Sequence, residues 1–245
     1  MKAGEGPDRI PIICADESAL ACATLFNPNL WSGKSRGIVQ SCWTESSVLC
    51  HCVRQLKDMC TRADHLCAKH VDAIQKQWAV AEFDVQKVVI FGEVPDLHMR
   101  IEAFFFGVKT LLDLLVQLLS SERVVTVAIH GFHRDKKIYG GVVLNALAHN
   151  ASSAKKDVAE KVIALLSAHK AEWIDQAISA RDRLIHPGES AFQLMFQLGF
   201  MEQNRKLLCT GVNPPAVGSE TIDRYAERVL GQTQAFSSSI LGLLK

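Results

Sequence analysis

The sequence has almost no excess charge of either sign. Its 245 residues include 27 lysines and arginines against 26 aspartates and glutamates, which gives a formal net charge of +1. A chain with so small a net charge does not attract polyanions strongly over its whole surface. The composition therefore excludes general electrostatic binding of nucleic acid, and any nucleic-acid site on this chain has to be a local basic patch.

The N-terminal residues lack the features of a secretory signal peptide. Residues 1–16 are polar and rich in glycine, without a long apolar stretch. We therefore expect a cytoplasmic protein whose eight cysteines are reduced and mostly buried. The longest apolar stretch, residues 101–119, contains Glu102, Lys109 and Asp113 within a helical pattern, which indicates a core helix and no membrane partner.

Several catalytic signatures are also missing. The chain has no phosphate-binding loop, dinucleotide fingerprint or Ser–His–Asp order, and its carboxylates do not pair as in a magnesium-dependent nuclease. Cysteines and histidines between residues 50 and 70 have the ligand types of a zinc site, but Cys52, Cys60 and Cys67 fall on the apolar stripe of one predicted helix. We expect buried thiols there, and neither a metal nor a cofactor in this protein.

Apolar residues recur at steps of three and four along most of the chain, which predicts a mainly α-helical fold. The period changes to two at residues 192–200, and a second strand over 206–212 gives a small β-hairpin before the C-terminal helix. We predict an up-and-down helical bundle, in which residues 1–43 form an N-terminal arm packed on the core and residues 44–245 form the helical domain. The helices are predicted at 44–82 with Thr44 as N-cap, 96–121, 142–149, 154–185 with an interruption near His169, and 219–244; residues 124–129 are strand-like.

Residues Arg181-Asp182-Arg183-Leu184-Ile185-His186 end one of these helices and run into Pro187-Gly188. Arginine is a permanent, forked cation that fits phosphate oxygens, and histidine transfers protons near neutral pH. Proline disfavours helical backbone at the residue before it, so His186 can leave the helix and turn toward Arg181. Two interpretations fit this pattern: a site that cleaves a phosphodiester without metal, or cations that complement the C-terminal end of a helix.

The motif Arg181-Asp182, three further residues and His186 resembles the signature of HEPN domains. That signature is an arginine, a polar residue directly after it, and a histidine four to six positions beyond the arginine. An aromatic-rich helix with Phe104-Phe105-Phe106-Gly107 precedes the motif, and the basic residues 131–141 lie between them, as in some bacterial members. The resemblance covers residues 44–245.

The resemblance implies a helical bundle that forms a homodimer, so that two Arg–His pairs share one cleft, with RNA as the partner. Many such domains are metal-independent endoribonucleases, and some are toxins neutralised by an antitoxin protein. Others are catalytically silent and bind RNA, nucleotides or protein partners. Both functions remain open for this chain on its sequence.

For a ribonuclease, the resemblance assigns catalytic roles to three residues. His186 would act as general acid or base, and Arg181 would neutralise charge on the phosphorane. Asp182 would orient one of them through a hydrogen bond. Arg183 is a secondary candidate for the phosphate contact.

A basic loop is the second candidate RNA contact. His133, Arg134, Lys136 and Lys137 lie close together in the sequence, and Phe132 beside them could stack on a base. The alternative is a solvated loop that Phe132 anchors in the core.

Overall fold

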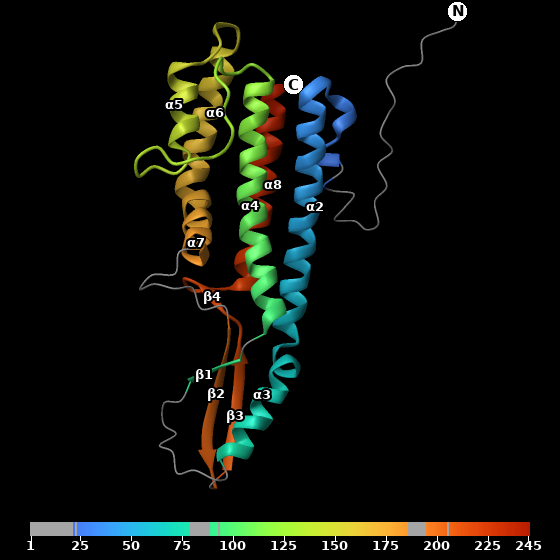
Figure 1. Cartoon of the computed structure of the whole chain (residues 1–245), viewed down its shortest axis with the longest axis vertical. Helices are drawn as coiled ribbons and strands as arrows, with labels where there is room; N and C mark the ends of the chain where they lie inside the picture. Colours follow the sequence, from blue (N-terminus) through green and yellow to red (C-terminus); the bar gives the residue numbers. More distant parts are fainter. Residues whose placement is uncertain (1–21, 23, 79–88, 93, 186–194, 205) are drawn as a thin grey trace, which may run out of the picture. The chain divides into compact units, whose positions relative to one another are not determined.

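The computed structural model describes residues 22, 24–78, 89–92, 94–185, 195–204 and 206–245 (Figure 1). The chain divides into two compact units, which are described separately. The first unit comprises Met1–Cys50, Phe106–Ile178 and Leu230–Lys245, and the second comprises His51–Phe105 and Ser179–Val229.

Helices dominate the described residues, and two short sheets accompany them. The helices are η1 (Pro28–Leu30), α2 (Gly33–Thr61), α3 (Ala63–Trp78), α4 (Pro95–Ser121), α5 (Gly141–His149), η2 (Ser153–Lys155), α6 (Lys156–His169), η3 (Lys170–Ile174), α7 (Asp175–Ile185) and α8 (Ile222–Leu244). The strands are β1 (Val89–Gly92), β2 (Phe196–Gln203), β3 (Lys206–Asn213), β4 (Ala216–Val217) and β5 (Glu220–Thr221). The predicted mainly helical bundle with a small hairpin before the C-terminal helix is confirmed.

In the first unit, α2 and α4 pack against each other in opposite directions. The hydroxyls of Ser35 and Ser121 lie 2.8 Å apart at one end of this contact. Further along, Gly107 of α4 lies so close to α2 that a Cβ atom there would be 2.9 Å from Leu49 Cδ2. The glycine therefore permits the close approach of the two helices.

The interruption predicted near His169 is a π-helical segment, η3, between α6 and α7. Trp173 of this segment is fully buried, and its Nε1 donates a hydrogen bond to His169 Nδ1 at 2.9 Å. Both rings pack against Phe236 of α8, with centroid separations of 6.4 Å for Trp173 and 5.2 Å for His169. The extra residue of a π turn thus serves to place an indole and an imidazole in the core of the first unit.

In the second unit, a three-stranded antiparallel sheet has the order β1-β2-β3. Strands β2 and β3 form the predicted hairpin, and Asn204 at its turn has a φ of 55°, a backbone region that asparagine tolerates. Helix α3 adjoins β3, where Gln75 Nε2 donates to the carbonyl of Leu207 at 3.1 Å. Within the same unit, the rings of Phe105 and Tyr225 are 5.9 Å apart.

The predicted start of the first long helix at Thr44 is wrong, because α2 begins at Gly33. Thr44 and Ser47 do not cap a helix; their hydroxyls donate to the carbonyls of Gln40 and Trp43, four residues earlier, at 3.2 and 2.9 Å. This back-bonding lets hydroxyl residues lie inside a helix. The predicted helix 44–82 is also divided, since α2 ends at Thr61 and α3 begins at Ala63, and the boundary between residues 43 and 44 falls inside α2.

The strand-like run 124–129 is also not a strand. Its one bridge pairs Val125 with Ala151. Two of its backbone amides bond to different parts of the first unit. Thr126 N–H donates to Asn150 O at 2.8 Å, and Ile129 N–H donates to Ser120 Oγ at 3.0 Å. The apolar residues of this run reflect a loop that is anchored at several points.

Helix α4 is, among the described helices, the one that is long and apolar enough to cross a membrane. A core helix of a soluble protein passes the same test of length and composition, and 56% of the most apolar window of α4 is buried. Length and composition alone therefore do not assign α4 to a membrane.

Candidate functional site

Helix α7 carries the described part of the Arg–His motif. Ala177, Ile178 and Ala180 are buried along this helix, and α7 extends to Ile185. Arg181 follows Ala177 by four residues and so emerges beside this buried stripe. His186, which the sequence places at the centre of the site, lies outside the described residues, as does Pro187.

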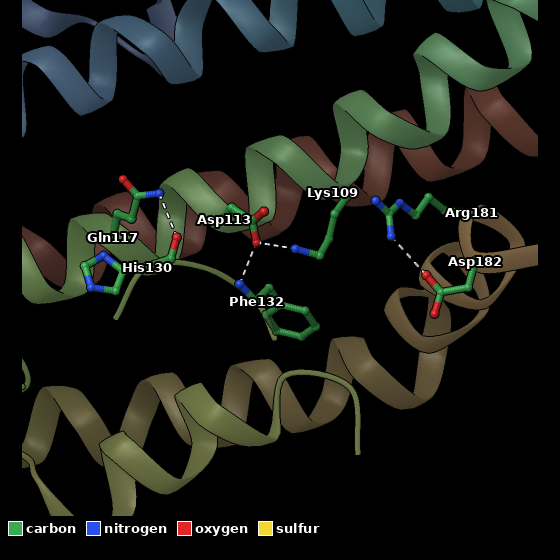
Figure 2. Close-up of polar contacts among 7 residues, drawn as sticks. All are labelled: Lys109, Asp113, Gln117, His130, Phe132, Arg181 and Asp182. Carbon is green, nitrogen blue, oxygen red and sulfur yellow. Dashed lines mark hydrogen bonds and ion pairs between the residues drawn. The ribbon is translucent and has the colours of Figure 1, made fainter. Parts of the chain in front are cut away.

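The guanidinium of Arg181 is held by its neighbour. Its Nη1 donates to Oδ1 of Asp182 at 3.1 Å, as Figure 2 shows. Each of the two side chains is 27% exposed. Such a half-buried pair adds little stability, but it restricts the rotamers of the arginine, whose side chain stays partly exposed. Asp182 therefore contacts Arg181, and its role in orienting a catalytic group stays a prediction.

Arg183, the secondary phosphate candidate, acts electrostatically on Tyr225, a fully buried residue of α8. Burial raises the pKa of Tyr225 to about 12, and the positive charges of Arg228 and Arg183 oppose that rise. The guanidinium carbon of Arg228 lies 5.1 Å from the centre of the same ring. Arg183 therefore contributes to the electrostatic environment of a buried tyrosine in the second unit.

The predicted RNA loop belongs to the first unit, where its aromatic residue is a core anchor. Phe132 is 2% exposed, and its backbone N–H donates to Asp113 Oδ1 at 2.5 Å (Figure 2). The prediction that Phe132 stacks on a base is wrong, because the ring is inaccessible. The alternative interpretation, a solvated loop with a buried phenylalanine anchor, is correct for this residue.

The cations of the loop are on the surface. His133, Arg134, Lys136 and Lys137 are all exposed. Arg134 bonds to the Tyr139 hydroxyl, and its guanidinium carbon lies over that ring, 4.0 Å from its centre. This cation therefore already has a partner within the loop. The loop therefore offers a small basic surface without an exposed aromatic residue at position 132.

The cysteines and histidines between residues 50 and 70 do not form a metal centre in the part of the chain that the structure describes. Cys52 and Cys67 are buried, whereas His51 and His65 are exposed. Among the described residues, no group of three or more His, Cys, Asp or Glu side chains could hold a metal ion. Burial also raises the pKa of the Cys67 thiol to about 11, which disfavours the thiolate that metals bind.

One feature that the sequence did not indicate is a pocket of about 590 Å³ in the first unit. Lys34 at the start of α2 and Arg123 just after α4 both line this pocket. These two cations are far apart in the sequence and belong to no motif. Arg123 has a φ of 55° at a helix end, where glycine is common, and no sequence pattern indicated it.

Comparison with known proteins finds no relative of this chain. No family model, no curated protein and no solved structure matches it. The resemblance to HEPN domains therefore depends on the motif at Arg181 and on the order of the helices.

Proposed function

We propose that this protein is a HEPN-like, metal-independent endoribonuclease. The observation that carries the proposal is Arg181, a partly exposed side chain near the end of a bundle helix that bonds to the neighbouring Asp182. His186 follows five residues later, at the position where the family motif has its histidine. The mainly helical fold is of the kind that the resemblance implies.

The proposed reaction is an intramolecular transesterification. The 2′-oxygen of RNA attacks the adjacent phosphorus, and the bond from phosphorus to the 5′-oxygen breaks. One imidazole takes the proton of the 2′-hydroxyl, and a second group gives a proton to the leaving 5′-oxygen. His186 takes one of these roles, and the same residue of a second subunit takes the other. Arg181 stabilises the negative charge that develops on the phosphorane.

The test is cleavage of end-labelled RNA by the purified full chain in excess EDTA. The variants are His186→Ala, Arg181→Ala and Arg181→Lys. Arg224→Ala is the matched control, because Arg224 is an exposed arginine on α8 outside the motif. We expect losses of about 100-fold or more for His186→Ala and Arg181→Ala, products ending in a 2′,3′-cyclic phosphate, and no change for the control. Equal cleavage by wild type and His186→Ala would refute the assignment.

The second candidate is a catalytically silent module that binds RNA, a nucleotide or a protein partner. The ion pair between Arg181 and Asp182 favours it, because a neighbouring carboxylate partly neutralises the cation that catalysis needs. Binding of RNA without cleavage by the wild type would support this candidate over the nuclease. Antitoxin-like partners and dimer formation belong to either version of the proposal.

A further inference from the structure

The pocket of the first unit lies where the end of α4 meets the start of α2. Lys34 comes from the first turn of α2, and Ser120 and Ser121 come from the last turn of α4. Arg123 and the following loop residues complete the wall, together with Ser152. Its volume of about 590 Å³ is within the range of sites that bind small organic ligands.

Two cations in this pocket have no partner within the described part of the chain. Lys34 and Arg123 are exposed, and neither side chain has a hydrogen-bond or ion-pair partner among the described residues. Among the residues that the structure describes, no aspartate or glutamate lines the pocket. Glu122, next to Arg123 in the sequence, faces Lys155 at 4.0 Å. The local potential is therefore positive, although the net charge of the chain is close to zero.

The backbone at Arg123 adds a second observation. Helix α4 ends with a pair of bonds from Arg123 N–H to Ser120 O at 3.1 Å and from Val124 N–H to Leu119 O at 2.9 Å. This pattern places Arg123 in the left-handed region, with a φ of 55°, where glycine is the usual residue. The pocket wall at this point is therefore a long cation at a position where glycine would be less strained.

The remaining walls combine hydroxyls with apolar groups. Ser120 Oγ accepts a hydrogen bond from Ile129 N–H at 3.0 Å, which leaves its own hydrogen available to a ligand. Val125, Val127 and Ala128 line the pocket beyond Arg123, and Val127 is 40% exposed. Donors and cations therefore adjoin an apolar surface.

We propose that this pocket binds a small phosphate monoester that carries an apolar group. The phosphate lies between Lys34 and Arg123, where charge-assisted hydrogen bonds hold it. The apolar group lies against Val127 and Ala128. A nucleoside monophosphate and a short-chain acylglycerol phosphate share this chemistry. All the residues concerned belong to the first unit, and none is in the Arg181 motif, so this site is independent of the proposed nuclease.

Isothermal titration of the full chain at low ionic strength tests the proposal. The probes are adenosine monophosphate, octanoyl-glycerol phosphate and inorganic phosphate. We expect at least one ester to bind more tightly than inorganic phosphate, and the ester that binds identifies the source of the ligand. Failure of all three to bind, or equal affinities for all three, would overturn the assignment.

Two variants test the cations directly. Arg123→Gly removes the guanidinium and suits the positive φ, so the variant folds at least as well as the wild type. Lys34→Gln removes the other charge. Each should weaken binding by about tenfold or more, whereas Lys156→Gln, at an exposed lysine of α6 outside the pocket, should leave it unchanged. Wild-type affinity in Arg123→Gly and Lys34→Gln would overturn the proposal, whatever the outcome of the RNA assay.

Discussion

Asp113 Oδ1 accepts the backbone N–H of Phe132 at 2.5 Å and so fixes the start of the basic loop to the middle of α4. The same oxygen accepts a bond from Lys109 Nζ, also at 2.5 Å. The side chains of Lys109 and Asp113 are only 15% and 26% exposed, so water screens this arrangement weakly. The carboxylate thus holds a loop whose ring is buried and whose cations are on the surface.

Replacement of Asp113 by alanine should release this loop. The free energy of unfolding should fall by about 1–3 kcal/mol, because the buried amide of Phe132 loses its acceptor. Hydrogen exchange measured by mass spectrometry should become faster in the peptide that contains Phe132. Asp113→Asn keeps an oxygen acceptor and should recover part of the protection.

Gln117→Ala is the matched control for this experiment, since Gln117 of the same helix is partly exposed and its Nε2 donates to the carbonyl of His130 at 2.9 Å. It should cost less stability than Asp113→Ala. A control that is as damaging as Asp113→Ala would show that the carboxylate has no special role in holding the loop.

Two glycines with nearly the same backbone angle allow a test of how tightly Phe132 is packed. Gly140 and Gly218 have φ values of 65° and 64°. A Cβ atom at Gly140 would overlap the ring of Phe132, whereas one at Gly218 would have nothing within 4 Å. Both alanine variants bear the strain of positive φ, but only Gly140→Ala adds a clash in the core.

We therefore expect Gly140→Ala to cost about 1–3 kcal/mol more than Gly218→Ala in denaturant unfolding. The difference isolates the contact with Phe132, since the backbone term is common to both. Similar losses in the two variants would mean that the ring moves aside freely, and the buried-anchor interpretation of the loop would fail.

The sequence predicted most of the elements, because their hydrophobic periods are long and regular. Helix α4, the hairpin of β2 and β3, and the interruption after His169 all follow from periodicity and from breaks in it. The start of α2 was predicted wrongly. Thr44 and Ser47 are residue types that cap helices, but their hydroxyls donate to carbonyls four residues earlier, inside the helix.

The candidate sites were harder to predict, because they depend on contacts between distant residues. The sequence left open whether Phe132 stacks on a base or anchors the loop, and the amide bond to Asp113 and the packing around Gly140 decide for the anchor. The pocket that joins Lys34 to Arg123 has no local pattern at all. The resemblance left open whether Asp182 bonds to Arg181 or to His186, and the structure shows a bond to Arg181.

Cys60 and Asp223 provide a test of the electrostatics in the second unit. The pKa of the Cys60 thiol is raised to about 12, first by burial and then by the negative charge of Asp223. Asp223→Asn removes that charge and should lower the thiol pKa, so a larger fraction is thiolate at mildly alkaline pH. Alkylation of Cys60 by iodoacetamide, followed by peptide mass spectrometry, should become several-fold faster.

Glu227→Gln is the control for Cys60, since it removes an exposed carboxylate of the same helix that pairs with Lys57 at 3.3 Å. It should leave the alkylation of Cys60 unchanged. An unchanged or slower reaction of Cys60 in Asp223→Asn would contradict the assigned effect of the carboxylate.

Ionisation of Tyr225 should lower the stability of the protein at alkaline pH. Its pKa is raised from an ordinary value of 10.0 to about 12, first by burial. The folded state therefore holds the phenolic proton more tightly than the unfolded state. The stabilisation is complete below pH 10 and is lost as the pH rises from 10 toward 12, at no more than about 1.4 kcal/mol per pH unit.

Tyr225→Phe should remove this contribution while keeping the ring in contact with Phe105. Among the described residues the Tyr225 hydroxyl has no hydrogen-bond partner, so at neutral pH the variant should be as stable as the wild type or up to about 1 kcal/mol more stable. Cys42 and Cys60 also have raised pKa values. The stability that they lose at alkaline pH is the same in the variant and in the wild type. The difference between the two unfolding curves from pH 9 to pH 12 therefore reports Tyr225 alone. Parallel curves over that range would show that the phenol titrates as it does in the unfolded chain.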